Sequence, residues 1–383
     1  MGKNKSKSKS KVLPLVSVCT PTFNRRPFIE NMLRCFRNQT YPKNRIEWII
    51  VDDGTDKVKD LIDKADIPQI KYFELPEKLT LGAKRNYMHK QVTGSIIVYM
   101  DDDDYYPPDR ISHAVEKLQG DPKALCAGSS EIYIYFKTLN RMVQCGPYGP
   151  NHATAGTFAF KSELLQQTRY EDHAALAEER AFLKEYTVPF VQLDPMKTIL
   201  VFSHEHNTFD KRKMLDNPHP DYLKTSTKTV DDFIKYEDEK PIKDFFMNHI
   251  DKLLDNYEPG LPKMKPDVLA QIKEIEAERA VMIEKLQKEQ AAANGPIILQ
   301  RQGQEPVQLS SQDAVNIMQQ QQKHIIDLTE KVKDLEKMVV KLQVQLVSKN
   351  KIVVNNTDGD AVTTSNVFVE ENKLTPLITV EGD

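Results

Sequence analysis

The sequence predicts an α/β fold: a Rossmann-like domain with a mixed, mostly parallel sheet and flanking helices, followed by a helical extension and a C-terminal coiled coil. Three observations predict it. Between residues 12 and 210, short β-branched runs alternate with amphipathic stretches, as in βαβ units. The later strand-like runs are unevenly spaced, so we expect a mixed sheet rather than a doubly wound one. Near the C-terminus, apolar residues recur every seven positions.

The composition excludes several classes of protein. The 383 residues leave room for about two domains, with 39% hydrophobic residues, 28% charged residues and a net charge of -3. This balance does not indicate a nucleic-acid partner. We expect no transmembrane segment, because no apolar run approaches the roughly 18 residues of a spanning helix. The four cysteines have no CxxC spacing and are expected to be reduced thiols in a cytoplasmic protein, in a host cytoplasm or virion if the protein is viral.

Residues 1–11 are expected to be a disordered basic tail, because lysines alternate there with Ser and Asn. Gly2 and Ser6 have the spacing of an N-myristoylation signal, but Lys3 departs from the usual pattern. We therefore interpret the segment as a solubilising tail and leave peripheral membrane contact open.

The expected elements follow in chain order. The first strands are predicted at residues 15–19, 48–51, 70–73 and 95–100, and the helices between and after them at 28–37, 57–64, 81–91 and 108–118. Further strand-like runs lie at residues 125–136, 142–145, 156–160 and 199–202. The predicted segments after this domain are a helical extension at 211–265, a helix at 266–294 that begins with a proline, and a linker at 295–309.

Residues 310–349 are predicted to form a coiled coil. Ile325, Val332 and Val339 repeat at one heptad position, and each is followed by Leu at the other. This arrangement favours a parallel two-stranded coiled coil, so we expect a homodimer through residues 311–349. A long helix packed on its own domain is the alternative. Residues 350–383 have no clear period and form a tail of uncertain structure.

Four consecutive aspartates, Asp101 to Asp104, follow a largely apolar strand and precede two tyrosines and two prolines. Carboxylates so close together repel one another strongly unless a cation or water screens them. Open α/β sheets bind their ligands at the carboxyl ends of the strands. A divalent cation shared with phosphates would remove the repulsion, so we predict a metal or nucleotide site rather than a solvated acidic turn.

Asp52 and Asp53 end an earlier strand in the same way, and Thr20–Arg25 follow the first strand. A carboxylate at such a position suits a ribose hydroxyl or the N–H of a base. The first strand is followed by neither a GxGxxG nor a GxxxxGK[ST] motif. A Rossmann dehydrogenase and a P-loop NTPase are therefore disfavoured.

Taken together, these motifs resemble the family 2 glycosyltransferases. The resemblance lies in VSVCTPTFN at Val16–Asn24, IIVDDGT at Ile49–Thr55, GAKRN at Gly82–Asn86 and GSIIVYMDDDDYYPP at Gly94–Pro108. Their order and spacing are similar to a GT-A catalytic domain over the first 210 residues, with some similarity to putative glycosyltransferases of large DNA viruses.

The resemblance implies inverting transfer of a sugar from a nucleoside-diphosphate sugar, which we expect to be a UDP-sugar, to a hydroxyl of a glycan or protein acceptor. It implies that Asp53 contacts the base, that Asp102 approaches the ribose and that Asp103 binds Mn²⁺ or Mg²⁺, with Asp101 as the alternative metal ligand. The remaining donor-site residues that it implies are Pro21, Thr22 and Phe23 around the nucleotide and Lys84 and Arg85 at the phosphates.

The acceptor side is expected later in the chain. The run LAEERAFL from Leu176 resembles the acidic motif of these enzymes, with Glu179 as catalytic base and Glu178 as the alternative. His204, after the strand at 199–202, matches the histidine that completes the metal site in GT-A enzymes, and His206 competes with it.

Two other functions stay open. A sugar nucleotidyltransferase shares a related core but needs a glycine-rich basic loop after its first strand, where this chain has Thr20–Arg26 without glycine. An inactive sugar-nucleotide fold that acts as a coiled-coil interaction protein is the other reading. The intact aspartate run and Glu179 disfavour it.

Overall fold

The computed structural model describes residues 13–353, apart from 177, 178, 208, 217, 295–296 and 301–304. The predicted basic tail 1–11 and residues 354–383 of the predicted C-terminal tail lie outside the described residues. The chain divides into two compact units, Met1–Val281 and Met282–Asp383.

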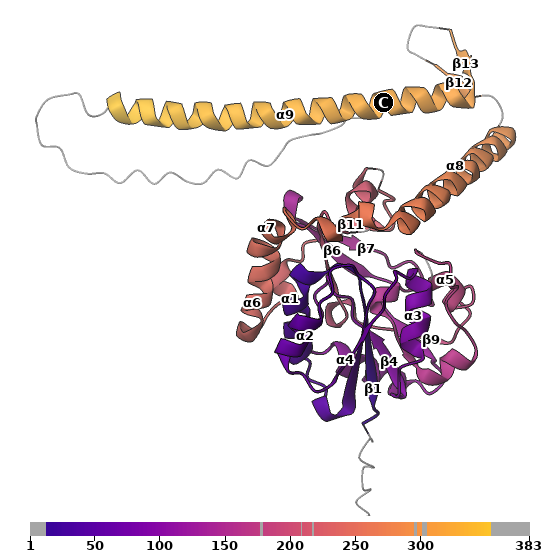
Figure 1. Ribbon diagram of the computed structural model, residues 1–383. Helices are drawn as coiled ribbons and strands as arrows, with labels where there is room; N and C mark the ends of the chain where they lie inside the picture. Colours follow the sequence, from indigo (N-terminus) through magenta and orange to yellow (C-terminus); the bar gives the residue numbers. More distant parts are fainter. Residues whose placement is uncertain are drawn as a thin grey trace, which may run out of the picture. The chain divides into compact units, whose positions relative to one another are not determined.

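The first unit is built on a seven-stranded sheet with the order β3-β2-β1-β4-β8-β5-β9. Its strands β1 and β4 lie side by side in Figure 1. The strands β1 to β4 are parallel to their neighbours within that group, whereas β8 runs antiparallel to both β4 and β5. The sheet is therefore mixed and mostly parallel, as predicted. Its strands are β1 (Val16–Thr22), β2 (Ile46–Asp52), β3 (Ile70–Glu74), β4 (Ile96–Tyr99), β5 (Cys126–Gly128), β8 (Ala159–Lys161) and β9 (Phe190–Gln192).

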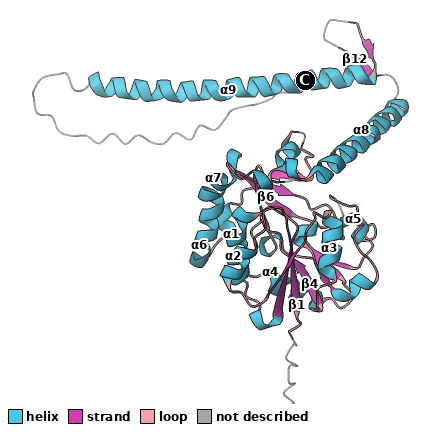
Figure 2. Ribbon diagram, viewed as in Figure 1, coloured by secondary structure: helices cyan, strands magenta, loops and turns pink. Residues whose placement is uncertain are grey.

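Helices cover both faces of this sheet, because its central strands bury apolar side chains in alternation (Figure 2). Trp48 and Ile50 of β2 belong to one core, and Ile49 and Val51 belong to the other. The first core packs against α1 and α4, and the second packs against α3 and α5. The helices are α1 (Arg26–Arg37), α2 (Lys59–Ala65), α3 (Leu81–His89), α4 (Arg110–Gly120) and α5 (Glu179–Phe182).

A smaller sheet has the order β10-β6-β7-β11. Its strands are β6 (Ile132–Phe136), β7 (Arg141–Cys145), β10 (Leu200–Ser203) and β11 (Leu223–Thr225). The strand β11 lies in the segment 211–265, which we expected to be helical, and it pairs antiparallel with β7. The strand β11 has only three residues, Leu223, Lys224 and Thr225, and so short a run is not long enough to show an alternating pattern in the sequence.

The rest of the segment 211–265 packs on this smaller sheet. Residues 240–254 form one continuous helical stretch, made of α6 (Lys240–Asp244), a π-helical turn (Phe245–His249) and α7 (Ile250–Leu254). Phe246 stacks on Phe202 of β10 with ring centroids 4.0 Å apart. This segment therefore completes a third core and belongs to the first unit.

The helix α8 (Pro266–Asn294) has the predicted limits. The segment 295–309, expected to be a linker, holds a two-stranded hairpin of β12 (Ile297–Leu299) and β13 (Val307–Leu309). The last helix, α9 (Ser311–Val353), covers the predicted coiled-coil segment and the first residues of the predicted tail. Among the described residues, no helix combines the length and apolar character of a bilayer span.

Candidate active site

A cleft of about 220 Å³ opens at the carboxyl ends of β1 and β4 in the first unit. It is lined by Pro21, Phe23, Arg25, Lys78, Leu79, Leu81, Lys84, Arg85, Asp101, Asp102, Asp103, Ala175, Leu176, Lys265 and Val268. Parallel strands bring their carboxyl ends to one edge of a sheet, so residues far apart in sequence meet there.

The turn after β1 is held in shape by Asn24. Its backbone is left-handed, with φ of 54°, a conformation that asparagine tolerates better than most residues. The Asn24 side chain accepts a hydrogen bond from Asp56 N at 2.9 Å and donates one to the Pro259 carbonyl at 2.8 Å. This turn directs Phe23 and Arg25 into the cleft.

The two aspartates that end β2 have different roles. Asp52 accepts hydrogen bonds from Gly54 N, Val58 N and the Tyr72 hydroxyl, all within its own neighbourhood. Asp53 instead forms a buried ion pair with Lys84 and accepts a hydrogen bond from Leu79 N at 2.7 Å. Asp53 is therefore bonded to two residues that line the cleft, Leu79 and Lys84, whereas Asp52 stabilises the turn.

Arg25 bridges the aspartates after β4. It lies 3.6 Å from Asp102 Oδ1 through Nε and 3.3 Å from Asp103 Oδ2 through Nη2. Its Nη1 donates to the His206 carbonyl at 3.0 Å. The buried Oδ2 of Asp102 has no hydrogen-bond partner among the described residues, although the Thr22 hydroxyl is close enough to act on the pKa of that carboxyl.

The pKa values of the two neighbouring carboxyls, Asp102 and Asp103, are shifted in opposite directions. Burial, and then the charge of Asp103, raise the pKa of Asp102 to about 7. Burial also acts to raise the pKa of Asp103, but Arg25 and His204 outweigh it and hold that pKa below its usual range. Asp103 is therefore the carboxylate of this pair that stays ionised, which is the form that binds a cation.

His204 lies against Asp103, as expected from its place after β10. Its Nε2 is 3.4 Å from Asp103 Oδ2 and 2.9 Å from Asn207 Nδ2. Burial lowers its pKa to about 4, although Asp103 opposes this shift, so the ring is neutral at pH 7 and can donate a nitrogen lone pair. His206 turns its backbone carbonyl, not its ring, to Arg25.

Glu179 begins α5 and accepts a hydrogen bond from Ala155 N at 3.1 Å. The same loop runs past Asp101: a Cβ on Gly156 would lie 2.8 Å from Asp101 Oδ2. The Tyr106 hydroxyl accepts from Asp101 N at 2.7 Å and donates to the Gly156 carbonyl. One loop thus links Glu179 to the aspartate run, while Glu178 lies outside the described residues.

Residues 17–185 match the family model described as glycosyl transferase family 2. The matched segment contains β2 to β8, all of β1 but its first residue, and the cleft-lining residues from Pro21 to Leu176. The match supports the predicted resemblance over less than half of the chain. The similarity to enzymes of large DNA viruses stays a prediction.

Relatives with similar sequences are also named as glycosyltransferases. The chain is 33% identical over 107 residues to a putative teichuronic acid biosynthesis glycosyltransferase, TuaG, of Bacillus subtilis, which covers 27% of this chain and 41% of that protein. It is 30% identical over 101 residues to the poly(ribitol-phosphate) beta-N-acetylglucosaminyltransferase TarS of Staphylococcus aureus, covering 26% of this chain and 18% of that protein. The chain thus spans less than half the length of these relatives.

Solved structures show a partial likeness. A mannosyltransferase from Pyrobaculum calidifontis in complex with GDP-Man and Mn²⁺ is 17% identical with a TM-score of 0.43, covering 72% of this chain and 80% of that one. A fragment of S. aureus TarS in complex with UDP-GlcNAc is 17% identical with a TM-score of 0.39, covering 63% of this chain and 71% of that one.

The segment 17–185 contains most of the predicted site residues. Pro21, Phe23, Lys84, Arg85 and the aspartates Asp101 to Asp103 line the cleft. Thr22 lies behind it, where its carbonyl accepts from Lys84 Nζ at 3.1 Å. Lys84 is paired with Asp53, and its predicted contact with phosphate stays a prediction.

Sequence reasoning assigned no role to three cations of the cleft, Arg25, Lys78 and Lys265. Arg25 follows the first strand in a run of two arginines, and only its burial distinguishes it from Arg26. Lys265 lies after the segment 17–185, and burial lowers its pKa to about 7, with Arg25 as the next cause. No motif of the sequence marks it.

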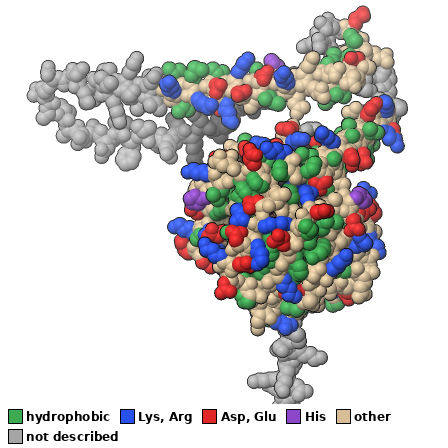
Figure 3. Space-filling model, viewed as in Figure 1, with side chains coloured by type: hydrophobic (Ala, Val, Ile, Leu, Met, Phe, Trp, Pro, Cys, Tyr) green, Lys and Arg blue, Asp and Glu red, His purple; other side chains and the backbone are tan. Residues whose placement is uncertain are grey.

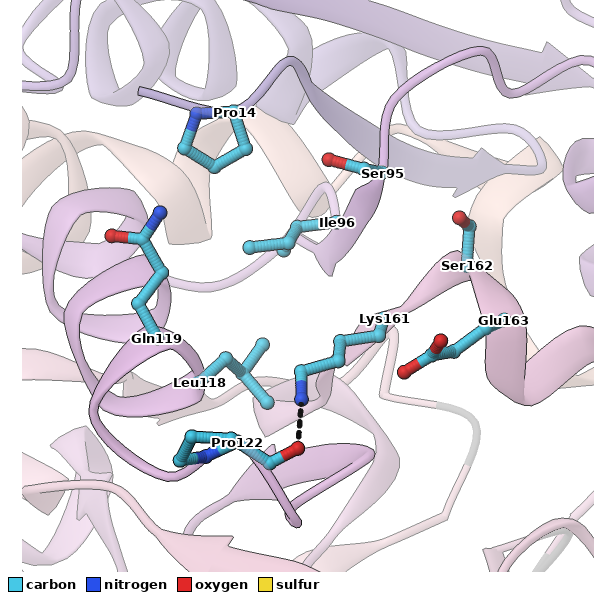
Figure 4. Close-up of a pocket in the computed structure, with 9 residues that line it drawn as sticks. All are labelled: Pro14, Ser95, Ile96, Leu118, Gln119, Pro122, Lys161, Ser162 and Glu163. Atoms are coloured by element: carbon cyan, nitrogen blue, oxygen red, sulfur yellow. Dashed lines mark hydrogen bonds between the residues drawn. The ribbon is translucent and has the colours of Figure 1, made fainter. Parts of the chain in front are cut away.

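A larger pocket of about 530 Å³ lies at the opposite end of the sheet, at the start of β1 and β4 (Figure 4). Lys161 crosses it and donates to the Pro122 carbonyl at 2.8 Å. Neither the aspartate run nor Glu179 borders this pocket, so the glycosyltransferase chemistry is expected at the other edge.

Proposed function

We propose that this chain is a metal-dependent inverting glycosyltransferase that transfers a sugar from a nucleoside-diphosphate sugar, expected to be a UDP-sugar, to a hydroxyl of a glycan or protein acceptor. The observation that carries the proposal is a set of contacts between separate parts of the chain: Asp102 and Asp103 line the cleft, Asp53 is paired with the cleft-lining Lys84, and His204 contacts Asp103. Those four residues supply contacts for a base, a ribose and a cation at one strand edge.

The nucleoside is expected to bind between Phe23 and Asp53. The Phe23 ring offers an apolar face for the base, and the Asp53 carboxylate is an acceptor for its N–H. The Oδ2 of Asp102, which has no hydrogen-bond partner among the described residues, suits a ribose hydroxyl. A hydroxyl donor there would satisfy a buried acceptor that otherwise destabilises the fold.

The residues present fit a hard divalent cation. Asp103 and the neutral ring of His204 offer an oxygen and a nitrogen whose separation of 3.4 Å lets both reach one ion. In the described part of the chain, no three His, Cys, Asp or Glu side chains gather into a complete metal site, so phosphate oxygens and water must supply the other ligands. A bound Mn²⁺ or Mg²⁺ would neutralise charge that develops on the departing diphosphate.

Glu179 is proposed as the general base. Its carboxylate takes the proton of the acceptor hydroxyl while that oxygen attacks the anomeric carbon from the face opposite the diphosphate. The hydrogen bond from Ala155 N holds the carboxylate next to Gly156, which approaches Asp101, and this proximity supports the assignment.

Calorimetric titration of UDP with and without Mn²⁺ tests the donor site. The wild-type protein is expected to bind UDP more tightly with Mn²⁺, and Asp103→Asn is expected to lose that gain, about tenfold or more in Kd, because the neutral amide is a poor cation ligand. Asp63→Asn, on the exposed surface of α2, is the matched control and should behave as wild type.

Equal Mn²⁺ dependence in Asp103→Asn and wild type would contradict the assignment of Asp103. If UDP does not bind, GDP and dTDP are titrated next. Failure of all three nucleotides would favour the inactive interaction protein.

We also propose that the chain is a homodimer through α9. The apolar residues of its heptad are exposed in the single chain, and Figure 3 shows hydrophobic side chains along this helix. Their exposed fractions are 62% for Ile325, 46% for Leu328, 53% for Val332, 58% for Leu335 and 52% for Val339. A second copy of the helix would bury this stripe.

A further inference from the structure

We propose that Lys265, which lies beyond the segment 17–185, contacts the diphosphate of the donor and stabilises it as a leaving group, and that the first turns of α8 hold it in place. This inference rests on the proposed function and deepens it. It assigns a role to a residue that no motif of the family segment contains.

Lys265 lies between the two ends of the donor cleft. At one end its ammonium is 5.8 Å from the centre of the Phe23 ring, where the base is expected. At the other end it lies close enough to Asp102 and Asp103 for their charges to act on it. In a nucleoside-diphosphate sugar, the diphosphate is the part that joins the nucleoside to the sugar, so a cation midway along the cleft faces it.

The first turns of α8 are fastened to both sides of this cleft. On the nucleoside side, Asp267 forms an ion pair with Lys78. The next residue, Leu79, donates its backbone N–H to Asp53. On the other side, Gln271 Oε1 accepts hydrogen bonds from Ala175 N at 2.8 Å and Leu176 N at 2.6 Å. Lys265 is therefore held on a rigid helix start rather than on a free loop.

In the proposed reaction, Lys265 acts only through its positive charge and its N–H donors. When the bond between the anomeric carbon and the diphosphate oxygen breaks, the electron pair stays on that oxygen and the new bond to the acceptor oxygen forms. The negative charge on the terminal phosphate increases, and the ammonium of Lys265 donates hydrogen bonds to it. Charge-assisted hydrogen bonds of this kind are the strong ones, and no proton needs to move.

A series of ligands that differ only in phosphate number separates a diphosphate contact from a structural role. Uridine, UMP and UDP are titrated by calorimetry into wild type, Lys265→Met and the control Lys263→Met, with Mn²⁺ present throughout. Lys263 is an exposed neighbour that pairs only loosely with Glu258, at 3.8 Å. Lys265→Met should weaken UDP binding by about tenfold to a hundredfold and leave uridine binding within about twofold.

Each other outcome has a distinct meaning. Equal loss of uridine and UDP binding in Lys265→Met would show that Lys265 has a structural role and would overturn the inference. Unchanged UDP binding in this variant would also overturn the inference, but would leave the proposed function intact. If wild type binds neither UDP, GDP nor dTDP, the proposed function fails first. Should Lys265→Met not melt cooperatively, Lys265→Arg against Lys265→Gln repeats the comparison, with tighter UDP binding expected for the arginine.

Discussion

A carboxylate far from the cleft organises the other end of the sheet. Glu47, near the start of β2, accepts hydrogen bonds from the Ser17 hydroxyl at 2.5 Å, from Thr93 and from Gly94 N, and forms an ion pair with Lys71. Burial alone would raise the pKa of Glu47, but these partners outweigh it and lower the pKa to about 2. The folded state therefore stabilises the ionised carboxylate of Glu47 relative to the unfolded chain.

This shift predicts a pH dependence of the unfolding free energy. Because the folded pKa is depressed, the stabilisation is present above the unfolded pKa of about 4.5 and is lost as the pH falls toward 2. Glu47→Gln should unfold with about 2 kcal/mol less free energy at pH 7, and the difference from wild type should shrink at pH 3. Urea unfolding at both pH values measures it.

The exposed Glu30→Gln on α1 is the control for removing a surface carboxylate that has one ion-pair partner. A deficit of Glu47→Gln that stays constant from pH 7 to pH 3 would show that packing, rather than charge, causes the loss.

At the scale of elements, the strands and helices that the sequence predicts best are those with a regular spacing of apolar residues. In β2 and β4, residues alternate between two buried faces, and such runs between amphipathic stretches identify strands without tertiary information. The strand β11 could not be found this way, because it is short and joins an edge. Lys265 is undetectable for a different reason: its environment is created by segments that approach it only in the fold.

The candidate site was predictable at the strand ends and not beyond them. The aspartates after β4 and β2 follow from the rule that ligands bind at the carboxyl ends of strands, whereas the histidine after β10 was predicted only from the resemblance to GT-A enzymes. Arg25 and Arg26 are neighbours of one type, yet Arg25 is buried against Asp102 whereas Arg26 binds Asp56 and Asp60. Arg25 directly follows the left-handed residue Asn24, a backbone feature that the sequence does not reveal.

The helix α9 carries a prediction of its own. Two lysines at facing positions of a parallel dimer repel each other in a desolvated seam, so the double variant Leu328→Lys, Leu335→Lys should be monomeric where wild type is dimeric. Sedimentation equilibrium should report the chain mass of 44.0 kDa for the variant and twice that for wild type.

Ile326→Lys, Val340→Lys is the matched control, because these residues are as exposed, at 60% and 59%, but lie off the heptad stripe. A wild-type mass of one chain would contradict the dimer. A monomeric control would show that lysines anywhere on α9 disrupt it.

At the scale of the whole molecule, the first unit extends well past the family segment. The third core contains Phe233, Phe245, Phe246 and Ile250, all of which come after residue 210. Each large apolar side chain contributes about 1.5 to 3 kcal/mol when buried, and whole domains are stable by only about 5 to 15 kcal/mol. The extension is therefore required for folding.

Two truncations test this conclusion. A chain of residues 1–281 should fold, bind UDP as the full chain does and be monomeric, because it keeps all three cores and Lys265 and lacks α9. A chain of residues 1–210 should not melt cooperatively, because it leaves one side of the smaller sheet uncovered. Circular dichroism melts and UDP titration compare them; a stable 1–210 chain would contradict the role of the extension.

The position of β8 between β4 and β5 has a consequence for synthesis of the protein. As the chain leaves the ribosome, β4 can pair with β1 at once, but its other edge waits for residues 159–161. At about 5 to 20 residues per second, that wait lasts several seconds. During this time the nascent chain exposes an apolar strand edge at the start of its aspartate run, which is the kind of edge that chaperones protect from pairing with other chains.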